Sequence, residues 1–309
     1  MKIRKILGLI LCAVLLAGMS GGCVKAQDTS AQEAGAQDKS VQEKGTQDTG
    51  TQTGEMTLLS INVRKGDAHL LRSGESVYLI DTGKKKHYDM LFSALKENGV
   101  DRLTGVILTH SHSDHTGGLK ELVKSDIIIE HVYTSAYYAP KKEDKENPVV
   151  KALKDTEMEV EYLRSGDTLP LDGGTLEVLG PLEEMTDADH ENSNSLVLLA
   201  KGGGGSILLT GDMEFPEEES LLKAGLIPRA DVIKIGNHGE EDATSEQLIA
   251  AVSPRLAIIP TNTEDEPDTP DPRVIQLLQK YNIPIAQTQE TESGVLVTFR
   301  NGEMTVTYQ

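Results

Sequence analysis

Thr109-His110-Ser111-His112-Ser113-Asp114-His115-Thr116-Gly117-Gly118 is the stretch of this chain that bears most directly on its fold. It follows a short apolar run, predicted as a buried strand over residues 105–109, and precedes a helix predicted over residues 118–123. Three imidazoles and one carboxylate fall within six residues, although the whole chain holds only 8 histidines. A solvated polar loop explains that density poorly, so we interpret the stretch as a metal site.

The spacing of these side chains divides them between two ions. In an extended or turning segment, residues i and i+2 point to the same side, so His110 and His112 can reach one ion. Asp114 and His115 follow the bend and can reach a second ion close by. Imidazole nitrogens and carboxylate oxygens are the donors that Zn²⁺ takes where thiolates are absent. The small residues Thr116–Gly118 are expected to let the chain turn tightly into the helix.

Three further candidate residues also stand at the ends of apolar runs. Asp81 lies in an Asp-Thr-Gly sequence, Asp212 in Thr-Gly-Asp, and His238 in Asn-His-Gly. Each signal is weak alone, because Asp-Thr-Gly is usually a turn and Asp212 could cap a helix. The recurrence of acids and imidazoles at strand ends predicts that they share one cleft.

The hydrophobic pattern predicts a mixed α/β fold. Strands are predicted over residues 57–63, 68–72, 77–81, 105–109, 127–133, 175–179, 195–200, 206–210, 232–235, 256–259, 283–286, 294–299 and 304–308. Helices are predicted over residues 88–98, 118–123, 245–252 and 272–281, and residues 135–147 as a long polar loop. Two sheet-rich halves, each with helices, predict a four-layer αββα sandwich built as one domain.

Composition excludes several classes of protein. Of the 309 residues, 38% are apolar and 26% charged, which fits a folded core and excludes a multi-pass membrane protein. The formal net charge of -19 excludes a basic nucleic-acid-binding module, because phosphate backbones are bound through Lys and Arg. Cys12 and Cys23 are the two cysteines, so the rest of the chain has no disulfide framework and no thiolate ligand.

The N-terminus reads as a targeting segment. Residues 1–22 combine a positive start, an apolar run of about a dozen residues and small residues before Cys23, which predicts a bacterial lipoprotein signal peptide. Ordinary secretion is the alternative; in both cases the mature chain leaves the cytoplasm. Residues 23–56 repeat a Gln-acid-small unit and predict a disordered tether. Residues 57–309 form the predicted hydrolase domain, and a lipid on Cys23 would attach it to the membrane.

Together these motifs resemble the metallo-β-lactamase superfamily. Their order and spacing are most similar to the branch that includes the soluble domain of the ComEC DNA-uptake channel, over residues 57–309. The resemblance implies a metallo-β-lactamase sandwich and metal-ligand roles for six side chains: His110 and His112 on the first metal, Asp114, His115 and His238 on the second, and Asp212 bridging both. It implies that Asp81 is a buried acid that orients a ligand histidine. Asp114 and His238 are the expected catalytic residues, with Asp114 orienting the attacking water.

The third ligand of the first metal stays open at this stage. Many superfamily members have a histidine before the strand predicted from residue 195, and here the candidates are His190, Asn192 and Asn194. Asn194 matches what the ComEC-type branch often has, and we expect it among the metal ligands. A site that binds one metal ion with high occupancy is therefore an alternative to a site that binds two. That branch also often has a histidine where this chain has Asn237, so a proton donor or substrate contact is missing here.

The expected function is metal-dependent hydrolysis of a phosphodiester or related ester outside the cytoplasm, through a metal-activated water. Zn²⁺, as one or two ions, is the expected cofactor, with Mn²⁺ as the alternative. The expected substrate is a small molecule or an envelope ester; nucleic acid stays a candidate that the acidic charge disfavours. The alternatives are a non-catalytic envelope lipoprotein that binds a metal or ligand and keeps the fold, and a purely structural lipoprotein.

Overall fold

The computed structural model describes residues 54–138, 146–183 and 191–309. The predicted signal peptide 1–22 and the predicted tether, up to residue 53, lie outside the described residues. The first strand, β1 (Glu55–Ile61), starts two residues before the predicted domain boundary. Met56 is buried there, so the folded region includes the last residues of the segment that was assigned to the tether.

One large sheet comes mostly from the first half of the described chain. Within the described residues its strand order is β17-β16-β1-β2-β3-β5-β7-β8. The strands added to β1 are β2 (His69–Ser73), β3 (Ser76–Ile80), β5 (Gly105–Leu108), β7 (Val132–Ser135), β8 (Val160–Leu163), β16 (Gly294–Arg300) and β17 (Glu303–Tyr308). β3, β5 and β7 are parallel neighbours, so their carboxyl ends meet at one edge.

The second large sheet comes from the second half of the chain. Its order in the described residues is β15-β14-β13-β12-β11-β10-β9. The strands are β9 (Thr168–Leu171), β10 (Gly174–Gly180), β11 (Val197–Gly202), β12 (Gly205–Leu209), β13 (Val232–Lys234), β14 (Leu256–Ile259) and β15 (Ile285–Gln287). β12, β13 and β14 are parallel, so their carboxyl ends also meet at one edge.

The strand predicted over residues 127–133 is wrong as a single element. Two short strands replace it: β6 (Ile128–Ile129), which pairs with β4 (Arg102–Leu103) in a separate two-stranded sheet, and β7 in the main sheet. The backbone changes sheets at residues 130–131, because Glu130 N donates to Leu103 O while His131 O accepts from Val106 N. The continuous apolar pattern does not reveal this change of partner.

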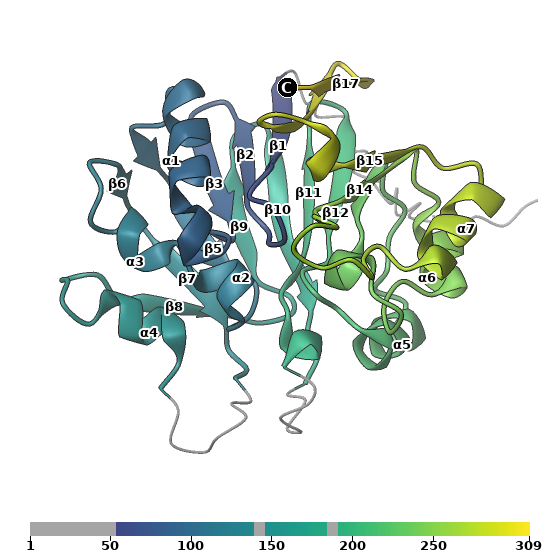
Figure 1. The fold of residues 1–309 in the computed structure, drawn as a ribbon, viewed down its shortest axis with the longest axis horizontal. Coiled ribbons are helices and arrows are strands. Elements are labelled where there is room, and N and C mark those ends of the chain that lie inside the picture. Colours follow the sequence, from purple (N-terminus) through teal and green to yellow (C-terminus); the bar gives the residue numbers. More distant parts are fainter. Residues whose placement is uncertain (1–53, 139–145, 184–190) are drawn as a thin grey trace, which may run out of the picture. The chain divides into compact units, whose positions relative to one another are not determined.

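Helices lie on the outer face of each sheet (Figure 1). They are α1 (Tyr88–Glu97), α2 (Ser113–Thr116), α3 (Leu119–Leu122), α4 (Pro148–Leu153), α5 (Phe215–Lys223), α6 (Glu246–Val252) and α7 (Pro272–Lys280). Short 3₁₀ turns are η1 (Lys85–His87), η3 (Asn192–Asn194), η4 (Gly236–Gly239) and η5 (Thr288–Glu290). The helices predicted over 88–98, 245–252 and 272–281 are confirmed, whereas α4 and α5 were not predicted.

Three groups of buried side chains define four layers. One group combines residues of both sheets, such as Leu58 and Leu198, and fills the space between them. A second joins the outer face of the first sheet to its helices and includes both Leu59 of β1 and Leu91 of α1. The third does the same for the second sheet. Because neighbours such as Leu58 and Leu59 point to opposite faces, each sheet is buried on both sides. The predicted αββα sandwich is confirmed.

The two sheets meet where the candidate ligands lie. Leu196 N donates a hydrogen bond of 2.9 Å to Thr109 O and so joins the start of β11 to the end of β5. Gly211 has φ +51°, and a Cβ there would stand 2.8 Å from Ser195 Cβ and 3.2 Å from Thr109 Cβ. Only glycine fits this crossing, which brings the loop after β12 against the loop after β5. No helix among the described residues is long and apolar enough to cross a bilayer.

Candidate metal centre

Asp212 is the point on which the histidines converge. Its Oδ2 lies 3.0 Å from His115 Nε2, 3.4 Å from His238 Nε2 and 3.8 Å from His110 Nε2. Asp212 N donates to Ser195 Oγ at 3.0 Å, which fixes the start of this loop. The four side chains come from three strand ends, those of β5, β12 and β13. The fold therefore brings together residues about a hundred positions apart, as the sequence predicted for one cleft.

Asp114 completes a four-donor group that we call the inner subsite: Asp114, His115, Asp212 and His238. Asp114 Oδ2 lies 3.8 Å from His238 Nε2. Ligand atoms of Asp114, His115 and His238 lie within 4.8 Å of one another, as do those of His110, His115 and Asp212. His115 and His238 are completely buried, and Asp212 nearly so. Imidazole and carboxylate donors at these separations are suited to a divalent cation of the Zn²⁺ type.

The outward ring nitrogens are held so that the inward ones face the centre. His115 Nδ1 lies 2.7 Å from Asp81 Oδ2, and His238 Nδ1 donates to Pro260 O at 2.9 Å. His110 Nδ1 lies 3.2 Å from Thr109 Oγ1. The Nε2 atoms of His110 and His238 are buried without a hydrogen-bond partner in the described structure. A buried polar atom is costly unless it is satisfied, so these two nitrogens fit a metal ion as their partner.

Asp81 supports the centre from behind. It accepts from Thr109 N and Thr109 Oγ1, both at 2.8 Å, as well as facing His115. Its φ of +62° is in the left-handed region, which is uncommon for a non-glycine residue and occurs often at functional sites. This is the contact expected of an acid that orients a ligand histidine.

The buried carboxylates around His115 also favour positive charge at the inner subsite. Burial would lower the pKa of His115, but the carboxylates of Asp212 and Asp81 outweigh burial and raise it well above its ordinary value. Burial would likewise raise the pKa of Asp212, yet His115, His238 and Lys234 hold it well below the usual range. The ring of His115 lies between the two buried carboxylates of Asp81 and Asp212. Positive charge on its Nε2 side, from a proton or from a bound metal ion, would offset these two negative charges.

The sequence analysis missed a buried ion pair under the inner subsite. Lys234 Nζ lies 2.6 Å from Asp67 Oδ2 and 3.2 Å from Asp212 Oδ1, and donates to Gly211 O at 2.5 Å. Lys234 therefore occupies one oxygen of Asp212 and leaves Oδ2 for the histidines. Asp67 Oδ1 also lies 3.4 Å from His238 Nδ1. The available signal was a lone lysine in the apolar strand β13, since an unpaired charge is rarely buried.

His110 and His112, which we call the outer subsite, are less completely assembled. Their ring centroids are 4.8 Å apart, and His112 is only partly buried. His112 is absent from the groups of converging donors found among the described residues. Asn194 is fully buried and its amide lies 3.5 Å from Glu191 Oε2, while Asn192 donates to Glu214.

His190, the other candidate for the third ligand of the first metal, lies outside the described residues. Glu191, not singled out from the sequence, accepts from Ser111 N at 3.2 Å and so lies beside this subsite.

A left-handed turn presents His238. Asn237 and His238 have φ values of +44° and +51°, which is strained for two successive non-glycine residues. Asn237 donates to Asp242 Oδ1 at 3.1 Å. Asn237 thus braces the turn in the position where the ComEC-type branch often has a histidine.

Gly117 and Gly118, expected to allow a tight turn, have ordinary helical φ values. Their small size is needed for packing, because a Cβ on Gly118 would lie 2.4 Å from Thr82 O.

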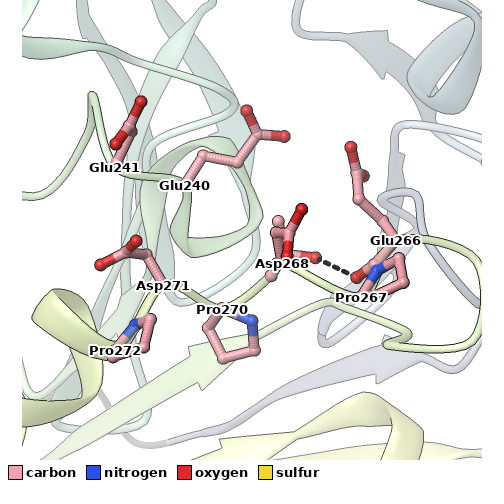
Figure 2. Close-up of a pocket in the computed structure, with 9 residues that line it drawn as sticks. Glu240, Glu241, Glu266, Pro267, Asp268, Pro270, Asp271 and Pro272 are labelled. Atoms are coloured by element: carbon pink, nitrogen blue, oxygen red, sulfur yellow. Dashed lines mark hydrogen bonds between the residues drawn. The ribbon is translucent and has the colours of Figure 1, made fainter.

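Lys65 links the centre to an acidic cavity. Its Nζ lies 3.6 Å from Asp114 Oδ2, 3.3 Å from Glu240 Oε1 and 2.5 Å from Glu266 Oε2. The cavity has a volume of about 620 Å³, and Figure 2 shows the carboxylates of Glu240, Glu241, Glu266, Asp268 and Asp271 around it. The segment 263–271 supplies three of these acids. Lys65 and the acids were not predicted as neighbours.

Comparison with known proteins identifies the class of protein that this fold and centre define. The family model of the metallo-beta-lactamase superfamily matches residues 61–261. The chain belongs to that superfamily, as its motifs predicted.

Its curated relatives include ComE operon protein 3 of Bacillus subtilis (strain 168), 31% identical over 204 residues that cover 65% of this chain and 25% of that protein. Recombination protein 2 of Haemophilus influenzae is 28% identical over 234 residues, covering 74% of this chain and 27% of that protein. These names confirm the predicted ComEC-type branch.

The chain spans about a quarter of the length of these relatives. Among solved structures, the metallo-beta-lactamase fold protein YhfI from Bacillus subtilis aligns with a TM-score of 0.51 at 14% identity, covering 79% of this chain and 99% of that one. This similarity shows the fold.

Proposed function

We propose that this protein is a metal-dependent hydrolase that attacks a phosphodiester or related ester with an activated water. The observation that supports the proposal most strongly is the convergence of three histidines on Asp212: His110, His115 and His238. Asp114 lies beside His238, and the outward nitrogens of His115 and His238 are already occupied. An ordinary buried cluster of this charge would be costly to fold without a cation. A divalent cation bound there would supply Lewis acidity and acidify a water towards neutral pH.

The chain's own residues contribute the positioning. Asp114 is partly exposed, its Oδ2 faces both His238 and Lys65, and it can orient the attacking water towards the ester. Lys234 holds Asp212 so that a single oxygen faces the histidines. His238 cannot turn, because its Nδ1 donates to Pro260 O and its backbone is held in the left-handed turn. Such preorganisation is what metal-assisted hydrolysis requires of the protein.

The types of donor atom support the proposed cofactor, and the charge of the chain supports the proposed substrate. The donors are nitrogen and carboxylate oxygen without thiolate, which favours Zn²⁺ and admits Mn²⁺. The net charge of -19 and the acidic cavity beside Lys65 disfavour long polyanions, which favours a small or envelope ester over DNA. One relative is named recombination protein 2, so DNA belongs among the substrates to be tested.

The proposed location is outside the cytoplasm, with the protein attached to the membrane through a lipid on Cys23. Support comes from the sequence of residues 1–23, where a positive start and an apolar run precede the cysteine. Labelling cells with a radioactive or clickable fatty acid would test it. Incorporation that Cys23→Ser abolishes is expected, and equal labelling of both proteins would contradict the anchor.

Metal content and turnover, measured together, test the proposed function. The purified protein, loaded with Zn²⁺ or Mn²⁺, is assayed on a chromogenic bis-aryl phosphodiester, on carboxylic esters, on lactams and on single- and double-stranded DNA. We expect at least one bound ion per chain and phosphodiester turnover that a chelator abolishes. Stoichiometric bound metal without turnover of any of these substrates would contradict the proposed hydrolase function.

The second candidate is a non-catalytic binding protein. Two observations favour it: His112 is partly exposed, and this chain has Asn237 where the ComEC-type branch often has a histidine. A site that no longer catalyses a reaction can lose such residues. Asp114→Ala discriminates the two functions: a binding protein keeps its ligand affinity without Asp114, whereas a hydrolase loses turnover.

A further inference from the structure

A second cavity opens beside the outer subsite. Its volume is about 570 Å³, and its wall is formed by Ser111, His112, Ser113, Thr116, Glu146, Pro148 and Lys151. Thus one wall is the turn that carries the metal motif, and the other is the start of α4. The described residues of the wall offer hydroxyl groups, an imidazole and one ammonium, with Glu146 as the one carboxylate among them. The metal motif itself therefore forms part of this cavity.

The position of His112 connects this cavity to the metal centre. The ring of His112 lies against that of His110, whose Nε2 is 3.8 Å from Asp212 Oδ2. A substrate whose scissile group lies over the inner subsite can therefore extend past His112 into the cavity. The route past Lys65 leads instead to the cavity with five carboxylates. The two cavities beside one centre thus differ in charge.

Lys151 is the one cationic side chain among the described residues that line the second cavity. It is exposed and, among the described residues, takes part in no ion pair, whereas Lys65, Lys85 and Lys86 are each paired with carboxylates. An ammonium that forms no ion pair with the described residues, beside hydroxyl donors, is suited to an oxyanion. The carboxylates of the other cavity repel the same group, and such repulsion sharpens selection.

We propose that the cavity beside His112 binds the negatively charged end of the substrate, the part that is not cleaved, and that Lys151 is its specificity-determining residue. This inference rests on the proposed hydrolase and adds the substrate class: an ester with a second oxyanion, a carboxylate or phosphate, beyond the scissile group. The oxyanion lies towards α4 and away from Glu240 and Glu266.

The test compares two chromogenic substrates. Both are 4-nitrophenyl phosphodiesters with the same spacer, which ends in a carboxylate in one and in the isosteric amide in the other. The metal-loaded full chain should prefer the carboxylate by about tenfold in kcat/KM, through KM, because the amide cannot form a charged hydrogen bond with Lys151; tenfold corresponds to about 1.4 kcal/mol. Lys151→Ala should remove the preference, and Lys151→Arg should keep most of it.

Lys154→Ala is the matched control. Lys154 is exposed at the end of the same helix but does not line the cavity, so its loss should leave the preference unchanged. A merely structural effect of the Lys151 substitution would change kcat/KM equally for both substrates and leave their ratio unchanged. Equal use of both substrates by the wild type, or an unchanged ratio in Lys151→Ala, would overturn the proposal.

A binding measurement separates this inference from the proposed function. If the wild type hydrolyses neither substrate, phosphodiester hydrolysis is refuted. Titration calorimetry with the uncleavable phosphonate that carries the same carboxylate then shows whether the cavity binds an oxyanion. Binding about tenfold weaker in Lys151→Ala than in Lys154→Ala would support the oxyanion site. Equal affinities in the two variants would refute it.

Discussion

The inner and outer subsites come from the same ten-residue motif, yet they are built differently. Asp114 and His115 join Asp212 and His238 from the other sheet, and every outward nitrogen of their histidines has a partner. His112 stands at the wall of a cavity and is absent from the converging donors of the described residues. The difference teaches that a dense motif in the sequence is completed only where distant strand ends supply further donors.

His238→Ala should have the largest effect. It removes one of four inner donors, so the cation that activates the water is lost and turnover falls to the uncatalysed background, a loss on the order of 10⁶-fold if the enzyme is an ordinary one. Bound metal, measured by mass spectrometry, should fall with it. His131→Ala is the control, because His131 is exposed and pairs with Glu161; it should keep full activity.

Lys234→Met should follow in size, and it tests what lies under the inner subsite. Removing the ammonium leaves Asp67 and Asp212 buried without their cation, which costs roughly 3–5 kcal/mol of unfolding free energy. Urea denaturation measures the loss. Adding Asp67→Asn should recover part of it, since one uncompensated charge is removed. A single mutant as stable as the wild type would show that this pair does not support the centre.

Asp81→Asn should weaken the metal site without removing a ligand. The amide keeps the shape but cannot hold His115 as a carboxylate does, and comparable changes cost about 10- to 100-fold in metal affinity. Competition with a chromophoric chelator gives the affinity. If the variant binds metal as tightly as the wild type, Asp81 contributes to the fold through its hydrogen bonds with Thr109 and does not support the metal site.

His112→Ala should have the smallest effect. The four inner donors remain, so one equivalent of metal should be retained and turnover should fall about tenfold, or about 1.4 kcal/mol in activation free energy. A loss as complete as that of His238→Ala would erase the distinction between the two subsites, and it would show that both ions are required.

The sequence predicted the sandwich and most of its strands because their apolar runs end at clear turns, as at Gly99 and at Asn301-Gly302. It predicted which strand ends bring acids and imidazoles together, because such residues are conspicuous after apolar runs. It could not predict α5, in which Glu217 and Glu218 are buried, since acids in a helix normally indicate an exposed face.

Asp67 and Lys65 were missed for a different reason. Both lie in the turn before β2, where Gly66 gave a turn signal and nothing in the local pattern indicated that the chain passes beside the loop of Asp114. Their role depends on contacts between segments far apart in the sequence. Such contacts follow from tertiary packing, which periodicity does not encode.

The side chains of the inner subsite belong to loops that follow strands of both sheets, joined at that edge by the Leu196–Thr109 hydrogen bond. An ion held there would cross-link the two halves of the sandwich, so binding and folding would be thermodynamically linked. At a free-ion concentration a hundred times the dissociation constant, the link adds about 2.7 kcal/mol. The fraction of folded molecules would then report the supply of free metal around the protein, and scarcity would remove the protein through unfolding as well as through lost turnover.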